Sequence, residues 1–313
     1  MSGIPSIREY LEANPLGPRD IIHGLCEQHG IDLDSPWPPV FDQPKQAVLR
    51  ALWPDSHRAG PNAIFRSALF PSLNFKEGRP YVEREKICSV DGITVFFTGK
   101  RFDQSDLDVY LELLHLAAEH PLGTELSFSA HALLKALGRS TGLSDYEWLH
   151  IVLTRLCGGV VDITDHKIRY FGQLLQGGER DEITSDYKIS INPRFAALFT
   201  RGLWSKIDHG QRQSLGRSMT AKALHAYYST HAAPGPHSFD TLAGVIGLKA
   251  KTKRNRNATI IKAHETLKNA GFLTDFQVMG DLIQTSFKPS LSQARHLVKK
   301  AAQGGLTKKK GTG

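Results

Sequence analysis

The chain has 313 residues, 40% hydrophobic and 22% charged, which is enough for about two domains with ordinary buried cores. It has no run of 18 apolar residues to span a membrane, and no basic segment followed by an apolar one at its start, so we expect neither a membrane helix nor a signal peptide and place it in the cytoplasm. The net charge is +8, but residues 1–60 carry −3 and the remainder +11, which favours a polyanionic partner for the basic part.

Residues 1–58 are predicted to form a separate helical N-terminal segment. Helical spacing predicts short helices over 6–13 and 18–29. The proline-rich stretch 34–39 cannot propagate a helix and is predicted to be a linker, and a further short helix is expected near 43–52.

The central region begins with a predicted β-hairpin over residues 87–98, because Asp91-Gly92 is a favoured two-residue hairpin turn. Apolar residues at helical spacing then predict a helix over 105–120 and a short helix over 129–137 that ends at Gly138.

A longer helix of this region is expected to begin behind Ser144, with Glu147 completing a capping box, and to run to about Cys157. Two strand-like runs follow, 160–164 and 167–175, which predict a second hairpin.

The last third of the sequence is predicted to contain three helices and a strand pair. One long helix is expected over 209–229, a short helix over 238–246 before Gly247, and another helix over 252–270 before Gly271. Strands 272–278 and 282–287 are expected to turn at Gly280-Asp281.

The central and last regions repeat the same order of elements at a nearly constant shift. The matched landmarks lie 109 to 111 residues apart, namely Ser127-Phe128 with Ser238-Phe239, Leu137-Gly138 with Ile246-Gly247, Leu156 with Leu267, and Leu114-His115 with Leu224-His225. The repeated order is helix, short helix, long helix and β-hairpin, which is typical of a winged helix.

The predicted fold class is therefore α+β and mainly helical, with two tandem winged-helix domains that carry β-hairpin wings. The expected boundaries are 1–58 for the N-terminal segment, 59–205 and 206–290 for the two domains, and 291–313 for a basic C-terminal tail.

Residues 249–262 are the strongest candidate for DNA contact. In a helix-turn-helix the second helix enters the major groove, where Arg pairs with guanine and Asn with adenine. This stretch contains no acidic residue and supplies the candidates Lys249, Lys251, Lys253, Arg254, Asn255, Arg256, Asn257 and Lys262. A solvated basic face is the alternative, and phosphate contact is the alternative to base contact for each residue.

The equivalent part of the first copy is less basic, since Asp145 and Glu147 stand near the start of its long helix. We expect this copy either to bind DNA more weakly or to make protein contacts. Its hairpin carries Lys167, Arg169 and Tyr170, which is consistent with a wing on the DNA backbone or with a hairpin that closes the core.

The sequence contains no phosphate-binding loop, HExxH motif or GxSxG motif, which are signatures of enzymes. Tyr227 and Tyr228 resemble a nicking tyrosine pair, but they stand among apolar helical positions and are predicted to pack in the core. Cys26, Cys88 and Cys157 are widely spaced, so buried reduced thiols are expected and neither a metal nor a cofactor is.

A family resemblance begins just before the first predicted domain and covers about residues 50–285. The matching segments are Trp53-Pro54-Asp55, Arg58-Ala59, Pro61-Asn62 and Arg66–Phe70, followed by Thr98-Gly99, Asp106-Leu107, Pro121–Gly123 and Arg194–Phe199. Together they resemble the plasmid replication initiators of the TrfA type.

This resemblance implies a protein that binds direct repeats, called iterons, in the double-stranded DNA of a plasmid origin. It implies active monomers in equilibrium with homodimers that limit copy number, opening of the origin, and recruitment of the host replicative helicase and its loader. It implies no polymerase or ATPase activity.

Some members of the family carry a sliding-clamp motif of the form QLxLF. Here Gln46-Ala47-Val48-Leu49 stands near the corresponding place without the second-position Leu and the final Phe, and an amphipathic turn is the alternative. The competing functions for the whole chain are a winged-helix transcriptional repressor, a nicking endonuclease and a pure protein-interaction module.

Overall fold

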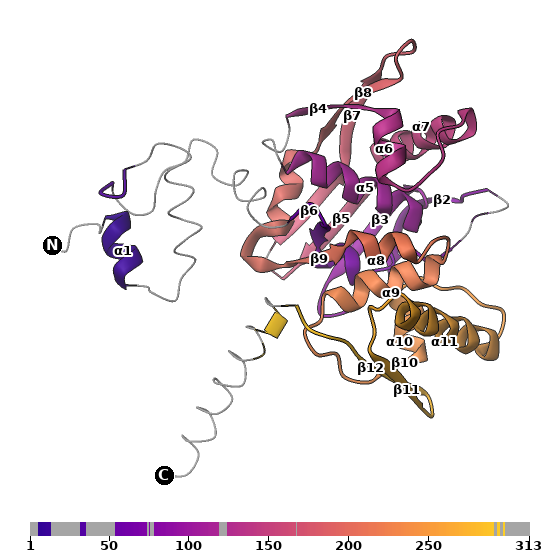
Figure 1. The fold of residues 1–313 in the computed structure, drawn as a ribbon. Helices are drawn as coiled ribbons and strands as arrows, with labels where there is room; N and C mark the ends of the chain where they lie inside the picture. Colours follow the sequence, from indigo (N-terminus) through magenta and orange to yellow (C-terminus); the bar gives the residue numbers. More distant parts are fainter. Residues whose placement is uncertain are drawn as a thin grey trace.

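The structure is a computed structural model whose described residues fold into helices packed with small antiparallel sheets, an α+β architecture (Figure 1). The described residues are 6–13, 32–35, 54–73, 75, 78–118, 124–166, 168–290, 293–294 and 297. The predicted helices 18–29 and 43–52, with Gln46–Leu49, lie outside them. Helix α1 (Ile7–Ala13) confirms the first predicted helix.

The described part of the chain from residue 54 to residue 208 contains most of the described strands, together with several helices. Its elements in order are β1 (His57–Pro61), α4 (Asn62–Phe65), β2 (Tyr81–Ile87), β3 (Thr94–Lys100), α5 (Gln104–Ala117), β4 (Glu125–Ser129), α6 (Ala130–Ala136), α7 (Leu143–Gly158), β5 (Val160–Asp165), β6 (Ile168–Gln173), β7 (Leu175–Arg180), β8 (Asp186–Ile191), the 3-10 helix η1 (Pro193–Gly202) and β9 (Trp204–Asp208).

The part after residue 208 is smaller and mainly helical. Its elements are α8 (His209–Ser214), α9 (Met219–Ser229), β10 (His237–Ser238), α10 (Phe239–Val245), α11 (Lys253–Asn269), β11 (Asp275–Met279) and β12 (Leu282–Ser286).

The described strands form four antiparallel sheets, of order β2-β3-β5-β6, β4-β8-β7, β1-β9 and β10-β12-β11. The hairpin β2–β3 turns where the sequence predicted it, since Asp91 and Gly92 both have positive φ values, 59° and 74°. Asn, Asp and Gly are the residues that tolerate this conformation, which a right-twisted two-residue hairpin requires.

The segments β4–α6–α7 and β10–α10–α11 share the same local construction. Ser129 and Ser238 cap the short helices α6 and α10, each accepting a bond from the backbone three residues on. Gly138 and Gly247 end these helices in the left-handed conformation with the same pair of backbone bonds. Cap and stop are both 109 residues apart, so the predicted match of Ser127 with Ser238 was wrong by two residues: Ser127 lies inside β4.

The first copy contains an additional hairpin, β5–β6. It lies in the chain between the long helix α7 and hairpin β7–β8, whose strand β8 pairs with the short strand β4. In the second copy β10 pairs with β12 of hairpin β11–β12. In the first, β4 pairs with β8 of hairpin β7–β8, whereas β5–β6 extends the sheet of β2 and β3. The predicted hairpin at 160–175 is therefore present, but its strand pairing differs from that of β11–β12.

The predicted single helix over 209–229 was wrong. Gly216 takes a left-handed conformation, with φ of 56°, between α8 and α9, and Ser218 caps the start of α9. Apolar spacing concealed this break because Leu215 before Gly216 is buried, as are Ala223 and Tyr227 in α9.

Two further predictions were wrong. Helix α7 starts behind Gly142 without a side-chain cap, so Ser144 lies inside its first turn and does not cap it. In the same turn the carboxylate of Asp145 accepts bonds from Ser140 and Arg139. Cys88 is exposed and Cys157 is only partly buried, whereas both were predicted to be buried, and Cys26 lies outside the described residues. Tyr227 and Tyr228 are buried as predicted.

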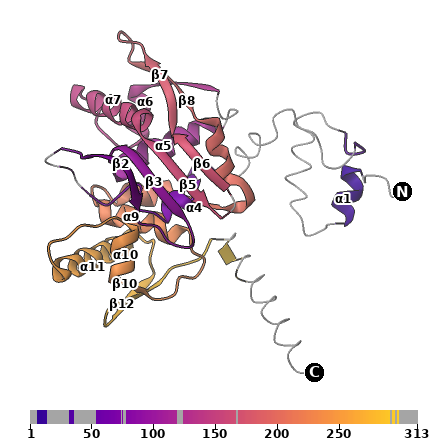
Figure 2. The ribbon, with the colours of Figure 1, turned by 180° about the vertical axis from the view of Figure 1, so that it is seen from behind.

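The buried apolar residues form two clusters. One surrounds α5 and contains Tyr110 and Phe195, whose rings meet edge to face at 5.4 Å; the other is formed by α9, α10 and α11 with hairpin β11–β12. Figures 1 and 2 show that this second group of elements lies at the end of the molecule opposite hairpin β7–β8.

Directed polar contacts link the two parts across α5 and α9. The buried Arg212 donates to Asp108 and to Gln104 of α5, and Lys222 of α9 donates to the same Asp108. Arg66 donates to both the hydroxyl and the carbonyl oxygen of Thr230. The two clusters are thereby held in one relative orientation.

His225 in α9 makes stability depend on pH. It is fully buried beside Phe272, neither ring nitrogen has a partner among the described residues, and burial lowers its pKa to about 3. The unfolded chain binds a proton near pH 6.5 and the folded chain does not, so the stability present above pH 6.5 is lost as pH falls toward 3.

We expect His225→Leu to be less sensitive to acid than the natural chain. The group contributes a loss of about 1.4 kcal/mol per pH unit, or about 2 kcal/mol between pH 6.5 and 5. Urea unfolding at several pH values measures it, with His131→Leu, on an exposed residue of α6, as control. Equal pH slopes in His225→Leu and the natural chain would contradict this assignment.

Candidate nucleic-acid interface

Most of the predicted DNA-contacting residues lie on α11 and on the turn before it, and two caps fix where α10 and α11 start. Ser238 holds the start of α10, and the Thr252 hydroxyl accepts a 3.1 Å bond from the backbone of Asn255 at the start of α11. Lys249 and Lys251 lie between the helices and are exposed. The first turn of α11, Lys253 to Asn255, is exposed to solvent.

The turn between α10 and α11 packs on the first part of the chain through Gly247. A Cβ atom at this position would lie 2.6 Å from Cβ of Pro71, closer than carbon atoms approach. The adjacent carbonyl of Ile246 accepts a 2.7 Å bond from the backbone of Ser72. Glycine is thus required here both for its left-handed φ of 62° and for its missing side chain.

One face of α11 docks the helix. Ile260, Ala263, His264 and Leu267 are buried on it. Nε2 of His264 lies 2.9 Å from the hydroxyl of Tyr228, and burial lowers the pKa of His264, so the ring stays neutral at pH 7. The buried face therefore fixes the rotation of the helix and the side that it turns to solvent.

The opposite face of α11 is cationic and open. With 3.6 residues per turn, Arg254, Ala258 and Lys262 form one row on it, with Asn255 beside the row. All four are exposed, and neither Arg254 nor Lys262 has an acidic partner in the described part of the chain. This row has the donors that read base edges or bind phosphates, and Ala258 allows close approach.

The other predicted residues of α11 are engaged within the protein. Arg256 is only 17% exposed and pairs with Asp240 of α10, and its Nε donates to Asn257 at 3.1 Å. Nζ of Lys253 lies 3.2 Å from Asp281 in the turn of hairpin β11–β12. The charge run in the sequence therefore contains both positioning residues and free ones, and only their non-local partners Asp240 and Asp281 distinguish the two.

Hairpin β5–β6 supplied the remaining predicted contacts. Both donors of Arg169 bind Asp162 on the neighbouring strand, at 2.7 and 2.9 Å, and Arg84 lies 3.9 Å from the same carboxylate. Lys167 lies outside the described residues. The structure thus places Arg169 in an ion pair far from α11 along the fold, on the four-stranded sheet.

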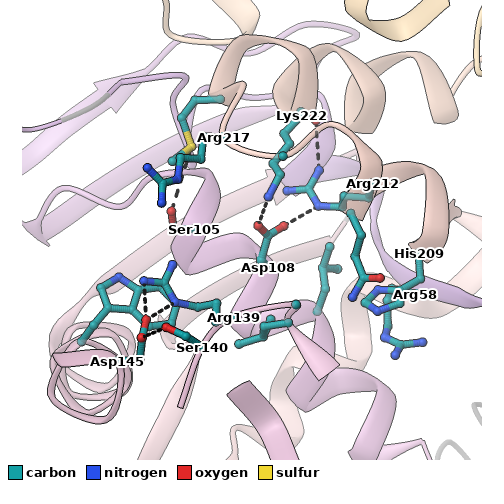
Figure 3. A pocket seen from close by; sticks show the side chains of 17 residues that line it. Arg58, Ser105, Asp108, Arg139, Ser140, Asp145, His209, Arg212, Arg217 and Lys222 are labelled. Atoms are coloured by element: carbon teal, nitrogen blue, oxygen red, sulfur yellow. Dashed lines mark hydrogen bonds and ion pairs between the residues drawn. The ribbon is translucent and has the colours of Figure 1, made fainter. Parts of the chain in front are cut away.

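A cavity of about 620 Å³ opens between the two parts of the chain (Figure 3). Its charged side chains largely neutralise one another: Asp108 binds both Arg212 and Lys222, while Arg139 binds Asp145 at 2.9 Å and covers the ring of Trp148 at 3.7 Å. Asp108, Arg212 and Lys222 form the joint between α5, α8 and α9, whereas the contacts of Arg139 stay beside and on α7.

Among the described residues, no group of three or more His, Cys, Asp or Glu side chains is arranged to hold a metal ion. Within the same residues, no helix is both long and apolar enough to cross a bilayer.

Comparison with known proteins agrees with this geometry. The model of the TrfA protein family matches residues 45–286, which is most of the chain. The chain belongs to the TrfA family.

A curated TrfA relative from Escherichia coli, the plasmid replication initiator protein TrfA, is 26% identical over 241 residues. The match covers 74% of this chain and 62% of that protein, so the chain spans less than two thirds of the relative's length.

Solved structures with a related fold also resemble this TrfA family member. Domains 2 and 3 of RctB match with a TM-score of 0.51 and 11% identity, over 73% of this chain and 98% of that one. The Pi initiator protein, solved in complex with iteron DNA, matches with a TM-score of 0.50 and 10% identity, over 75% of this chain and 98% of that one. At these identities the likeness shows a common fold.

Gly247 gives a direct test of how the turn is seated. We expect Gly247→Ala to destabilise the protein by at least about twice as much as Gly271→Ala. Both change a left-handed glycine, at about 1–2 kcal/mol, but only Gly247 also meets Pro71; nothing lies within 4 Å of a Cβ at Gly271. Denaturant unfolding measures the difference, and equal losses would show that the turn is not packed on Pro71.

The ion pair between α10 and α11 is tested by a double-mutant cycle. We expect Arg256→Ala and Asp240→Ala to be coupled by about 0.5–1 kcal/mol in unfolding free energy, because the pair is partly exposed. Arg254→Ala serves as the matched control and is expected to show no coupling to Asp240→Ala. If Arg254→Ala were coupled to Asp240→Ala as strongly as Arg256→Ala is, the assignment of the ion pair to Arg256 would be wrong.

Proposed function

We propose that this chain is a plasmid replication initiator that binds repeated double-stranded DNA sequences in an origin, with α11 in the major groove. The observation that carries the proposal is the open row of Arg254, Ala258 and Lys262 on a capped helix-turn-helix in a chain of the TrfA family. Two comparisons support this function: the curated relative is a plasmid replication initiator, and the Pi initiator protein was solved in complex with iteron DNA.

The fold proposed for this function is a pair of tandem winged helices. The repeated order of strand, short helix, long helix and paired hairpin supports it, with β7–β8 and β11–β12 as the wings. We propose boundaries of 59–205 and 206–290, preceded by the segment 1–58 and followed by the basic tail 291–313. The pairing of β1 with β9 joins the ends of the first domain, which favours moving its boundaries to 57 and 208 and the start of the second domain to 209.

Different residues are assigned different tasks in DNA binding. Arg254 and Asn255 are proposed to read base edges, because they stand in the first turn of α11, where a recognition helix meets the bases. Lys249, Lys251 and Lys262 are proposed to contact phosphates. Lys253 is assigned the same task, although its ion pair with Asp281 neutralises part of its charge. Arg256 and Asn257 are proposed to position the helix, and Lys167 and Arg169 to add backbone contacts.

The remaining proposals concern partners and setting. Active monomers, homodimers that limit copy number, and recruitment of the host replicative helicase and its loader would accompany origin opening. Clamp binding through Gln46–Leu49 belongs to the same set. The protein would act in the cytoplasm through binding and DNA deformation rather than as an enzyme.

The central test is binding to origin repeats across a salt series. We expect Arg254→Ala with Lys262→Ala to weaken binding to the repeats at least about 10-fold, and to lower the log–log salt slope by about one unit per lost phosphate contact. Discrimination against scrambled DNA should fall mainly through Arg254. Electrophoretic or fluorescence titration measures both quantities.

The matched control is Lys86→Ala with Lys100→Ala, which removes the same charge from exposed positions on β2 and β3, on the side of the four-stranded sheet away from β6 and Arg169. The control should retain repeat binding within about 2-fold, since charges beyond a Debye length of about 10 Å are screened. If both double variants weakened repeat binding equally, α11 would contribute only non-specific positive charge and would not be the recognition helix. Repeat binding without any replication of an origin plasmid would favour a repressor.

A further inference from the structure

The outward face of α7 is the equivalent, in the first copy, of the cationic face of α11. Both helices follow a short capped helix and a left-handed glycine, and both are docked by four residues in the same positions. The buried pairs, each 111 residues apart, are Leu149 with Ile260, Val152 with Ala263, Leu153 with His264, and Leu156 with Leu267. Because the docked faces correspond, the faces turned to solvent correspond as well.

The two outward faces have opposite chemistry. At the same shift, Leu143 and Ile151 of α7 stand where α11 has Arg254 and Lys262, and Glu147 stands where α11 has Ala258. Leu143 is 89% exposed and Ile151 is 54% exposed, which are high values for large aliphatic side chains in a well-packed region.

The charge of α7 also disfavours a nucleic-acid partner. Helix α11 contains five basic residues and one acidic residue, whereas α7 contains two acidic residues and one basic residue. That basic residue, Arg155, is held by the buried Asp106, at 2.6 Å. Asp145 is neutralised by Arg139, but Glu147 is exposed and has no basic partner among the described residues. A phosphate backbone would therefore meet an uncompensated carboxylate.

The hairpin β7–β8 extends this surface. Its Tyr187 lies 3.2 Å from His150 of α7, which joins hairpin and helix. Arg180 is occupied by Glu182, at 3.6 Å, and by the ring of Tyr187. Ile183 at the hairpin tip is 95% exposed. The charge of the hairpin is net acidic, with four acidic residues and two basic ones over 175–191.

We propose that the outward face of α7 docks a basic amphipathic helix of another protein. Leu143 and Ile151 are about 12 Å apart along the helix, two turns, and match apolar side chains spaced two turns apart on a partner helix. Glu147 between them matches a lysine or arginine, and the acidic hairpin favours the same sign of charge. The proposal rests on the internal repeat and does not require that α11 bind DNA.

The test combines binding, replication and photo-crosslinking with the full chain. In one variant Leu143→Ser is combined with Ile151→Ser, in a second Glu147→Lys reverses the charge, and the matched control Ser144→Ala with Thr154→Ala alters exposed neighbours on α7. A benzophenone amino acid in place of Ile151 is crosslinked in cells that maintain the origin plasmid. Thermal unfolding verifies that each variant is folded.

We expect the first two variants to bind origin repeats within about 2-fold of the natural chain while plasmid maintenance falls at least about 10-fold, with no change in the control. The crosslink should reach a lysine- or arginine-rich helical segment of a different protein, and Glu147→Lys should remove it.

Four outcomes overturn the proposal. A crosslink to DNA, or a 10-fold loss of repeat binding in Leu143→Ser with Ile151→Ser, would make α7 a DNA-contacting helix. A crosslink to a second copy of the chain, or within the same chain, would give the face another occupant. An acidic crosslinked segment, or one indifferent to Glu147→Lys, would refute the charge match. Normal plasmid maintenance in both variants would show a solvated face. Because crosslinking is read independently of DNA titration, failure of α11 to bind DNA is recognised separately.

Discussion

The docking of a long helix by one face that is buried at matching positions in both copies is the constraint on which the rest of the molecule depends. A serine cap, a left-handed glycine and four buried positions set the start, direction and rotation of α7 and of α11. Burying such positions contributes roughly 1.5–3 kcal/mol per large apolar side chain, so the docked face tolerates little change. The outward face makes no contribution of this kind, and its residues are free to differ between the copies.

Local signals in the sequence were enough to predict much of this frame. Gly138, Gly247 and Gly271 end helices as predicted, and Asp91-Gly92 forms the predicted turn. These positions were predictable because the tolerance for a positive φ value depends on the residue type itself. The cationic stretch that becomes the start of α11 was also visible, since side-chain charge requires no tertiary information. The α+β class followed from the same local patterns.

Non-local choices were not predictable from one sequence. The pairing of β4 with β8 skips a complete hairpin, and only the assembled sheet shows that β5–β6 belongs with β3 instead. Likewise, Arg256 reads as a DNA contact in the sequence, and its partner Asp240 lies 16 residues away on another helix. The break between α8 and α9 at Gly216 was not predicted, because buried residues occur on both sides of it.

The joint between the two parts determines how the two outward faces are presented. It consists of bonds with fixed directions: the guanidinium of Arg212 donates to Asp108, to Gln104 and to the carbonyl of Lys222. Removing any acceptor would leave a buried donor unsatisfied, at a cost of about 1–3 kcal/mol, so the joint favours one orientation over a range of them. The cationic face of α11 and the apolar, acidic face of α7 are therefore carried on one connected frame, and a partner held on α7 would have a defined position relative to whatever α11 binds.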